Sequence, residues 1–490
     1  MVNPLWSLAL ITNMMLFLNE KKSGNAFAFK RTFCIFANKT IGITEKDFDD
    51  AFPCRQSCSM KTFLGFLQNN PIDKYKIRHM KKQTYLLMAI LLVAVATAVA
   101  GNKNGKFVRV SGPDLIQPNG QKLFIQGTNL GNWLNPEGYM FGFSRTNSAW
   151  MIDLMIKEAV GPDGAAEFWK AFKDNYITRD DIMFIKQQGA NTIRLPFNYK
   201  LFTDEDYMGL TSQQDGFKRM DDVVKWCREA GLYLILDMHD CPGGQTGDNI
   251  DDSYGYPWLF ESEACQVLYC DIWKRIAQHY RNEPVILGYE LANEPIAHYF
   301  ENKEDLNRKL EPLYKRAVKA IREADPNHVI LLGGARWNSD FYMFSDWTFD
   351  NNIMYTCHRY GGDATKEAIK DYIDFRDKTN LPMYMGEIGH NTDEWQAQFV
   401  RVMKEVNIGY TFWPYKKIDG SCMMGIQRPE LWDSIVVKFS EARRNAYNQI
   451  REARPNQQQF RTLLMQYAEN SRFPNCKPQE GYIRSLGLKE

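Results

Sequence analysis

Neither sign of charge is in excess in this sequence of 490 residues. Sixty lysine and arginine residues stand against 59 aspartate and glutamate residues, which gives a formal net charge of +1 at pH 7. Proteins that bind nucleic acid or anionic membrane surfaces carry a clear surplus or patch of basic residues. The sequence therefore predicts no nucleic-acid partner, and we expect its substrate to be neutral.

Metal-binding motifs are also missing. The chain has 7 histidines and no His-x-His pair, whereas metal-dependent hydrolases need clustered His and Asp ligands. Its 10 cysteines stand singly, and Cys54 and Cys58 have no second pair that would complete a zinc site. Three cysteines precede residue 101, and the other seven are an odd number, so at least one thiol is unpaired. We expect no metal and no cofactor, and we interpret the cysteines mostly as small buried hydrophobic residues.

The most prominent apolar run is too short for a confident membrane span. It covers residues 85–95, whereas a spanning helix needs about 20 apolar residues. Two lysines precede the run and the small residues 96–100 follow it, which is the layout of a secretory signal peptide. We interpret residues 80–100 as this signal, with the mature chain beginning near Gly101. We expect a secreted, periplasmic or extracellular protein without stable membrane insertion after cleavage.

Residues 1–79 precede this signal, although a signal peptide works from the N-terminus of a chain. We interpret them as the product of a misassigned start codon upstream of Met80. The alternative is a genuine, disordered N-terminal extension, since no periodic segment in it predicts a folded domain. In that case the segment from Met80 would be a poor internal anchor.

From about residue 107 the sequence alternates between short apolar strands and helices. Eight strands are predicted at 122–127, 191–196, 232–237, 285–290, 329–332, 353–356, 382–386 and 408–413. Helices are predicted at 266–280, at 306–323 and from a capping box formed by Thr178 and Asp181. Apolar strands joined by helices predict an α/β fold, a closed parallel (β/α)8 TIM barrel, in one catalytic domain over 101–490.

Residues past about 437 are interpreted as a closing helix and a polar C-terminal helical extension. This stretch opens with a charge run that contains Arg443, Arg444, Arg451 and Arg454. A charge run of this kind is usually a solvated face, and we expect these side chains to point into water.

The reactive residues of such barrels lie at the carboxyl ends of the strands. The polar and aromatic residues that follow the predicted strands are Arg194, His239, Asn293, Glu294, His358, Tyr360, Glu387 and Trp413. Glu294 follows the fourth strand and Glu387 the seventh, and barrel closure can bring two such carboxylates face to face. Retaining hydrolysis of a glycosidic bond uses two carboxyl groups about 5 to 5.5 Å apart, one as nucleophile and one as acid/base. We expect Glu294 to be the protonated acid/base and Glu387 the nucleophile, kept ionised by Arg194.

These residues in this order resemble glycoside hydrolase family 5, the cellulase-like family of the retaining clan A. The matching segments are Asn191–Pro196, Leu236–His239, Ala292–Pro295, Cys357–Tyr360, Gly386–Gly389 and Phe412–Trp413, within about residues 107–437. The resemblance implies that Asn293 bonds the sugar 2-hydroxyl and that Tyr360 contacts the nucleophile. It also implies that His239 and His358 line the subsite and that Trp413 forms a stacking floor. The implied activity is hydrolysis of β-glucan-type polysaccharides or oligosaccharides.

Two loops resemble those of one subgroup of the family. Residues 127–139 and 240–249 are similar to loops of exo-β-1,3-glucanases, and the second loop is long enough to favour cutting from chain ends. Mannan, xyloglucan and glycosylceramide stay open as substrates, because the family includes enzymes for each of them. No carbohydrate-binding module or low-complexity linker is found, which favours soluble glucans over crystalline cellulose.

A catalytically weak glycan-binding barrel protein is the alternative from another functional class. Its signature would be the loss of one of the two carboxylates, and both Glu294 and Glu387 are present. We therefore favour the enzyme, and we expect it to be a monomer.

Overall fold

The structure is a computed structural model that describes residues 105–209, 212 and 214–489. The predicted N-terminal extension 1–79 and the predicted signal peptide 80–100 lie outside the described residues. Within the described part of the chain, no helix is both long and apolar enough to cross a membrane.

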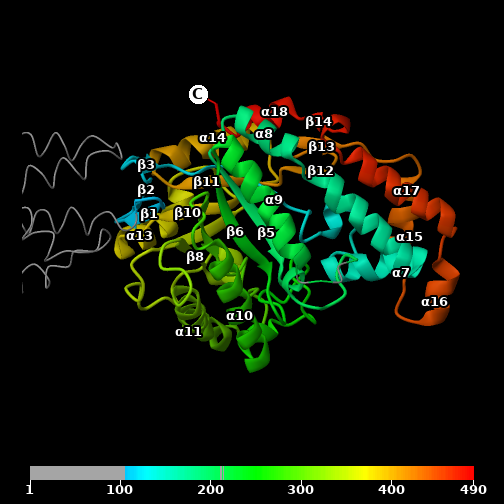
Figure 1. The fold of residues 1–490 in the computed structure, drawn as a ribbon, viewed down its shortest axis with the longest axis horizontal. Coiled ribbons are helices and arrows are strands. Elements are labelled where there is room, and N and C mark those ends of the chain that lie inside the picture. The colour runs from blue at the N-terminus through cyan, green and yellow to red at the C-terminus, as the bar shows by residue number, and fades with distance from the viewer. Residues whose placement is uncertain (1–104, 210–211, 213, 490) are drawn as a thin grey trace, which may run out of the picture. The chain divides into compact units, whose positions relative to one another are not determined.

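A closed barrel of eight parallel strands forms the centre of the fold (Figure 1). The strands are β4 (Gln126–Asn129), β5 (Thr192–Asn198), β6 (Tyr233–Asp240), β7 (Ile286–Glu290), β8 (Val329–Gly333), β9 (Ile353–Arg359), β10 (Met383–Gly389) and β11 (Gly409–Trp413). Each strand pairs with its neighbour in sequence order, and β11 closes the ring on β4. The predicted (β/α)8 TIM barrel is therefore confirmed.

The first barrel strand differs from its prediction at 122–127. Lys122–Leu123 forms β3 of a separate antiparallel sheet with β1 (Arg109–Ser111) and β2 (Asp114–Ile116). The turn between β2 and β3 contains Gly120, whose φ of 85° suits glycine and lets the chain reverse at once. The barrel strand β4 therefore begins later than predicted.

Helices cover the outside of the barrel, as the alternation in the sequence predicts (Figure 1). They include α8 (Arg179–Gln187), α9 (Gln214–Ala230), α10 (Glu263–Tyr280), α11 (Lys303–Arg322), α13 (Lys370–Thr379) and α14 (Asp393–Glu405). The capping box predicted for Thr178 and Asp181 forms and starts α8. Helix α10 begins earlier than the predicted residue 266, because Ser262 caps it by accepting the backbone N–H of Cys265.

The C-terminal extension is more closely packed than the sequence predicts. It contains α16 (Tyr447–Ala453), α17 (Gln457–Asn470) and α18 (Glu480–Ser485). Helix α17 packs along α7 (Ala149–Tyr176) beside the barrel (Figure 1). Three of the four arginines expected on a solvated face are exposed, but the Arg444 guanidinium pairs with Glu158 of α7. The prediction is therefore wrong for Arg444, because α7 lies where water was expected.

A buried lysine ties this extension to the barrel. Nζ of Lys416 lies 2.6 Å from Oδ1 of Asp181, at the start of α8, and both side chains are fully buried. The same ammonium donates a 3.0 Å hydrogen bond to the backbone oxygen of Ser471, just after α17. At the far end of the chain, Nε2 of Gln126 on β4 donates to the backbone oxygen of Leu488 at 3.1 Å. The extension and the barrel therefore fold as one body.

Candidate active site

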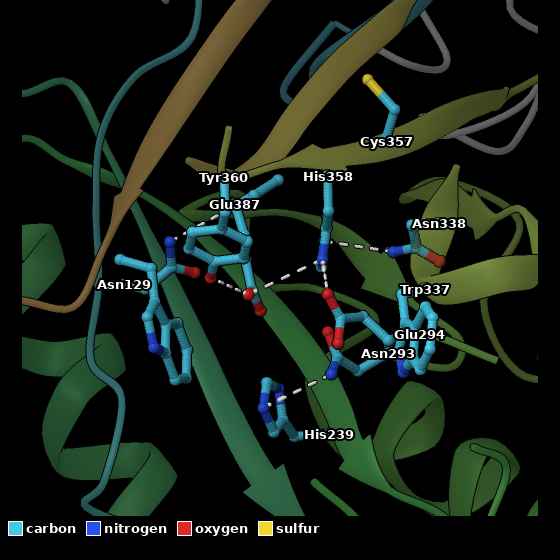
Figure 2. A network of polar contacts seen from close by, with 12 residues as sticks. Asn129, His239, Asn293, Glu294, Trp337, Asn338, Cys357, His358, Tyr360 and Glu387 are labelled. Atoms are coloured by element: carbon cyan, nitrogen blue, oxygen red, sulfur yellow. Dashed lines mark hydrogen bonds and ion pairs between the residues drawn. The ribbon is translucent and has the colours of Figure 1, made fainter. Parts of the chain in front are cut away.

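All eight predicted site residues meet at the carboxyl ends of the barrel strands, and Figure 2 shows most of them. They are Arg194 (β5), His239 (β6), Asn293 and Glu294 (after β7), His358 (β9), Tyr360 (after β9), Glu387 (β10) and Trp413 (β11). All of these side chains except Tyr360 are buried, and Tyr360 is half-buried. The structure brings the eight into one constellation, because a parallel barrel gathers its strand ends at one mouth.

The two carboxylates of the constellation lie close together. One oxygen of Glu294, one of Glu387 and a ring nitrogen of His358 all fall within 4.8 Å of one another. Nδ1 of His358 lies 2.8 Å from Oε1 of Glu294 and 3.6 Å from Oε2 of Glu387 (Figure 2). Two carboxyl groups at this separation suit a retaining reaction, whereas an inverting one needs about 6.5 to 9.5 Å.

Glu387 is held as a carboxylate by its neighbours. Nη1 of Arg194 donates to its Oε1 at 2.7 Å, and the Tyr360 hydroxyl donates to its Oε2. Burial alone would raise the pKa of Glu387, but His358, Arg194, His239 and the Tyr360 hydrogen bond together lower that pKa to about 2. The group is therefore ionised at any pH at which the protein is expected to work.

The surroundings of Glu294 favour its protonated form. Burial raises its pKa above the usual carboxyl range, and the charge of Glu387 raises it further, against the hydrogen bond from His358. Its backbone has a φ of 48°, and the hydroxyl of Thr246 fixes it by donating to the Glu294 carbonyl oxygen at 2.7 Å. Two neighbouring carboxyl groups with pKa values shifted apart can act as a proton donor and a charged nucleophile.

Arg194 is a buried cation surrounded by carboxylates. Its guanidinium binds Glu290 through Nε and Nη2, both at 2.8 Å, and lies 3.0 Å from Asp237. Burial alone would lower the pKa of Arg194, but the three surrounding carboxylates raise it well above its usual value. The arginine therefore stays charged, and its Nη2 also donates to Oδ1 of Asn293 at 2.8 Å.

His239 and Asn293 are oriented by the same network. Nδ1 of His239 lies 2.7 Å from Oδ2 of Asp237, and its Nε2 lies 3.4 Å from Nδ2 of Asn293. Burial would lower the pKa of His239, but Asp237 and Glu137 raise it to about 10. Its ring stacks on that of Trp413 with centroids 5.2 Å apart and an interplanar angle of 3°. The stack fixes the orientation of the indole at the mouth.

Residues that the sequence analysis missed also line the pocket, whose volume is about 400 Å³. They are Glu137, Tyr139, Asn249, Ile250 and His390. Tyr139 accepts a 2.6 Å hydrogen bond from Nε1 of Trp413 and contacts His390. His390 is the first residue after β10, so the strand-end rule that identified Glu387 could have found it.

Glu137 follows no strand end. It lies in the long loop between β4 and α7, within the stretch 127–139 that resembles exo-β-1,3-glucanase loops but for which no site residue was predicted. Oε1 of Glu137 is buried and has no hydrogen-bond partner among the described residues, although Nε2 of His239 lies 3.7 Å away. Burial raises the pKa of Glu137. The pocket thus contains a third carboxyl group with free hydrogen-bonding capacity.

In the described part of the chain, Glu294, His358 and Glu387 form the one group of side chains spaced for a metal ion. The Arg194 guanidinium, 2.7 Å from Glu387, already neutralises that carboxylate and repels a second cation.

The seven described cysteines are all free, and six of them are buried. Burial raises the thiol pKa of Cys241 and Cys357 near the mouth, which makes them poor nucleophiles. The interpretation of the cysteines as small buried hydrophobic residues is confirmed for the six buried ones, and Cys265 is half-buried.

Comparison with known proteins relates this chain to the cellulase family. Residues 157–418 match the family model Cellulase (glycosyl hydrolase family 5). A protein named "Beta-xylosidase" from Phanerodontia chrysosporium is 29% identical over 361 residues, which cover 66% of this chain and 73% of the relative. "Endoglucanase C" from Acetivibrio thermocellus is 26% identical over 313 residues, covering 51% of this chain and 88% of the relative.

A solved structure shares the fold. The crystal structure of an endogalactoceramidase superposes with a TM-score of 0.51 at 16% identity, covering 78% of this chain and 84% of that protein. At this level of identity the likeness extends to the barrel architecture alone.

Proposed function

Because the chain belongs to the cellulase family, glycosyl hydrolase family 5, it is a glycoside hydrolase, and we propose that it cleaves β-glucan-type polysaccharides or oligosaccharides with retention. The observation that supports this most is the pair Glu294 and Glu387. Oxygens of the two groups lie within 4.8 Å, and their pKa values are shifted in opposite directions.

The proposed reaction is a double displacement. An oxygen of Glu387 bonds to the anomeric carbon while Glu294 gives its proton to the leaving oxygen. Glu294, now a carboxylate, then removes a proton from water as that water breaks the bond between the sugar and Glu387. Arg194 and the Tyr360 hydroxyl keep Glu387 charged and fixed for attack.

The sugar that reacts would lie in the pocket between Trp413 and the two carboxylates. Asn293, held by Arg194, is the proposed partner of the sugar 2-hydroxyl, and Trp413 is the proposed stacking floor. The unpartnered Oε1 of Glu137 offers an acceptor for a further hydroxyl. His239 and His358 complete the lining of this subsite.

We propose that a second cavity, of about 440 Å³, holds the leaving group. Its lining begins at Ile296, two residues past Glu294, and includes Asn307, Arg336, Asp340 and Tyr342. Oδ1 of Asn307 is buried there without a hydrogen-bond partner among the described residues. Charged and amide groups suit the hydroxyls of a second sugar and disfavour a lipid chain, so we propose a glycan leaving group over a ceramide.

The test is product analysis with matched variants. Purified protein is incubated with laminarin, lichenan, carboxymethyl-cellulose, xyloglucan and mannan oligosaccharides, alongside Glu294→Gln, Glu387→Gln and the control Glu311→Gln. Glu311 is a buried carboxylate outside the pocket. We expect hydrolysis of one β-glucan with the β-anomer released first, a loss of about 10²-fold or more in the two site variants, and near-normal activity in the control.

Different outcomes separate the alternatives. A glucose-sized product alone would indicate exo action, and a ladder of products would indicate an open cleft. Initial release of the α-anomer would refute the retaining mechanism. Binding without hydrolysis on every substrate would favour the catalytically weak glycan-binding protein.

We also propose that the protein is secreted. If residues 80–100 are a signal peptide, N-terminal sequencing of protein recovered from the culture medium gives a start near Gly101. Recovery of a chain that still contains residues 1–79 would refute both the signal and the misassigned start.

A further inference from the structure

Asn338 contacts the ring that links the two carboxylates. Its Nδ2 lies 3.1 Å from Nε2 of His358, and Nδ1 of the same ring lies 2.8 Å from Oε1 of Glu294 (Figure 2). Asn338 is fully buried at the end of the short helix α12 (Ala335–Asn338), which follows β8. One imidazole ring therefore separates this amide from the proposed acid/base.

The backbone around Asn338 is strained. Arg336, Trp337 and Asn338 have φ values of 50°, 53° and 59°, so three successive residues with side chains lie in the left-handed region. Such conformations persist where the surrounding structure enforces them, and they cluster at functional sites. A Cβ atom on Gly333 would come within 2.1 Å of Oδ1 of Asn338, so a glycine there makes room for the amide.

In the structure the amide of Asn338 turns its nitrogen toward the ring of His358. Oδ1 of Asn338 is buried and accepts no hydrogen bond from the described residues, while Nδ2 points at His358. An amide nitrogen is a donor and not an acceptor. With the amide in this orientation Nε2 of His358 accepts, and a neutral ring then carries its hydrogen on Nδ1.

Building on the proposed function, we infer that Asn338 is a positioning residue that sets the tautomer of His358 and thereby places the acidic hydrogen of Glu294. With its hydrogen on Nδ1, the ring donates to Oε1 of Glu294. The acidic hydrogen of Glu294 is then on Oε2, which has no hydrogen bond from the described residues, and it can pass to the leaving oxygen. In the other tautomer Nδ1 would accept that hydrogen and hold it away from the substrate.

The charged groups around His358 explain why its tautomer depends on the donor group of Asn338. Glu294 and Glu387 face Nδ1 of His358, and Oε1 of Glu290 lies 4.0 Å from Nε2. Glu294 in turn faces His358, Glu387 and His239. Without the Asn338 amide, Glu290 would attract a hydrogen to Nε2, and the ring would lose its donor toward Glu294.

The first test replaces the amide by an apolar group of similar size, in Asn338→Leu. We expect the activity on a β-glucan to fall at least about 10-fold, and much less on a dinitrophenyl β-glucoside, whose leaving group needs little acid assistance. Because Nδ1 would now accept from protonated Glu294, the pKa of Glu294 rises. The alkaline limb of the kcat/KM profile should therefore move up by about one pH unit.

The second test reads the tautomer directly and needs no turnover. Nitrogen NMR of histidine-labelled protein, with the His358 signals assigned from a His358→Gln variant, should show the hydrogen on Nδ1 in the unaltered protein. Asn338→Asp puts an acceptor in place of the donor and should add a hydrogen to Nε2. A protein that hydrolyses no glycan but shows these signals would refute the proposed function and leave the tautomer assignment standing.

A matched control separates positioning from packing. Asn352→Leu removes another buried amide, one that binds the backbone N–H of Val110 outside the active site. It should lower the melting temperature and leave the alkaline limb in place. Equal losses on both substrates with an unmoved limb in Asn338→Leu, or a hydrogen on Nε2 in the unaltered protein, would overturn the inference.

Discussion

Removal of one hydroxyl group should move the acid limb of the pH profile without changing the pocket. In Tyr360→Phe, Glu387 loses the hydrogen bond that the Tyr360 hydroxyl donates to its Oε2. That bond favours the ionised carboxylate, so its loss raises the pKa of Glu387. The enzyme should then lose activity at a higher pH on the acid side, because the nucleophile must be ionised to attack.

The expected size of the shift follows from the neighbours of Glu387. A hydrogen bond to a charged group contributes about 1.5 to 3 kcal/mol, and 1.36 kcal/mol corresponds to about one pKa unit. Tyr360 is the weakest of the four groups that lower this pKa, after His358, Arg194 and His239. We therefore take the low end and expect the pKa to rise from about 2 to roughly one unit higher.

The assay is kcat/KM on the preferred glucan from pH 2 to neutrality, with activity after return to pH 6 as a check for acid unfolding. Tyr289→Phe is the control, since its buried hydroxyl binds Asp325 outside the pocket. An acid limb in Tyr360→Phe that coincides with that of the unaltered protein would refute the electrostatic reasoning. A matching shift in Tyr289→Phe would do the same.

Two further predictions concern stability. Lys416→Met leaves the buried carboxylate of Asp181 without its ion pair, so the free energy of unfolding in calorimetry should fall by about 3 to 5 kcal/mol. Lys170→Met, at an exposed pair with Asp174, should change it by less than about 1 kcal/mol, and equal effects would contradict the argument. Because the seven described cysteines are free, a reductant should leave the melting temperature unchanged. A lower melting temperature after reduction would reveal a disulfide.

The strand-end rule located the candidate site because of a geometric property of parallel barrels. Every strand runs in the same direction, so residues far apart in sequence share one mouth once the ring closes. Glu294 and Glu387 could be placed together on this ground alone. Glu137 could not, because a loop residue has no strand end to fix its position, and its approach to His239 depends on how that loop folds back.

Asn338 and the C-terminal extension show two other features that were not predicted from the sequence. Asn338 stands five residues past β8, and only the left-handed turn at 336–338 returns its side chain to His358. Local propensity argues against such a turn, so the sequence offers no signal for it. The packing of α17 was readable, since Phe460, Leu463, Leu464 and Tyr467 follow the spacing of a buried helix face. The predicted polar extension rests on the charge of the nearby arginines and does not take this apolar face into account.

The closure of the ring has a consequence for the order of biosynthesis. Strand β4 pairs with β5, which follows soon after it, and with β11, which is translated almost three hundred residues later. The side chain of Gln126 on this strand also gains its hydrogen-bond partner only after Leu488 has been translated. During translation the first barrel strand therefore stays half-paired until nearly the whole chain has left the ribosome. An unpaired strand edge invites wrong partners, so this interval is where chaperones should matter most for the yield of folded protein.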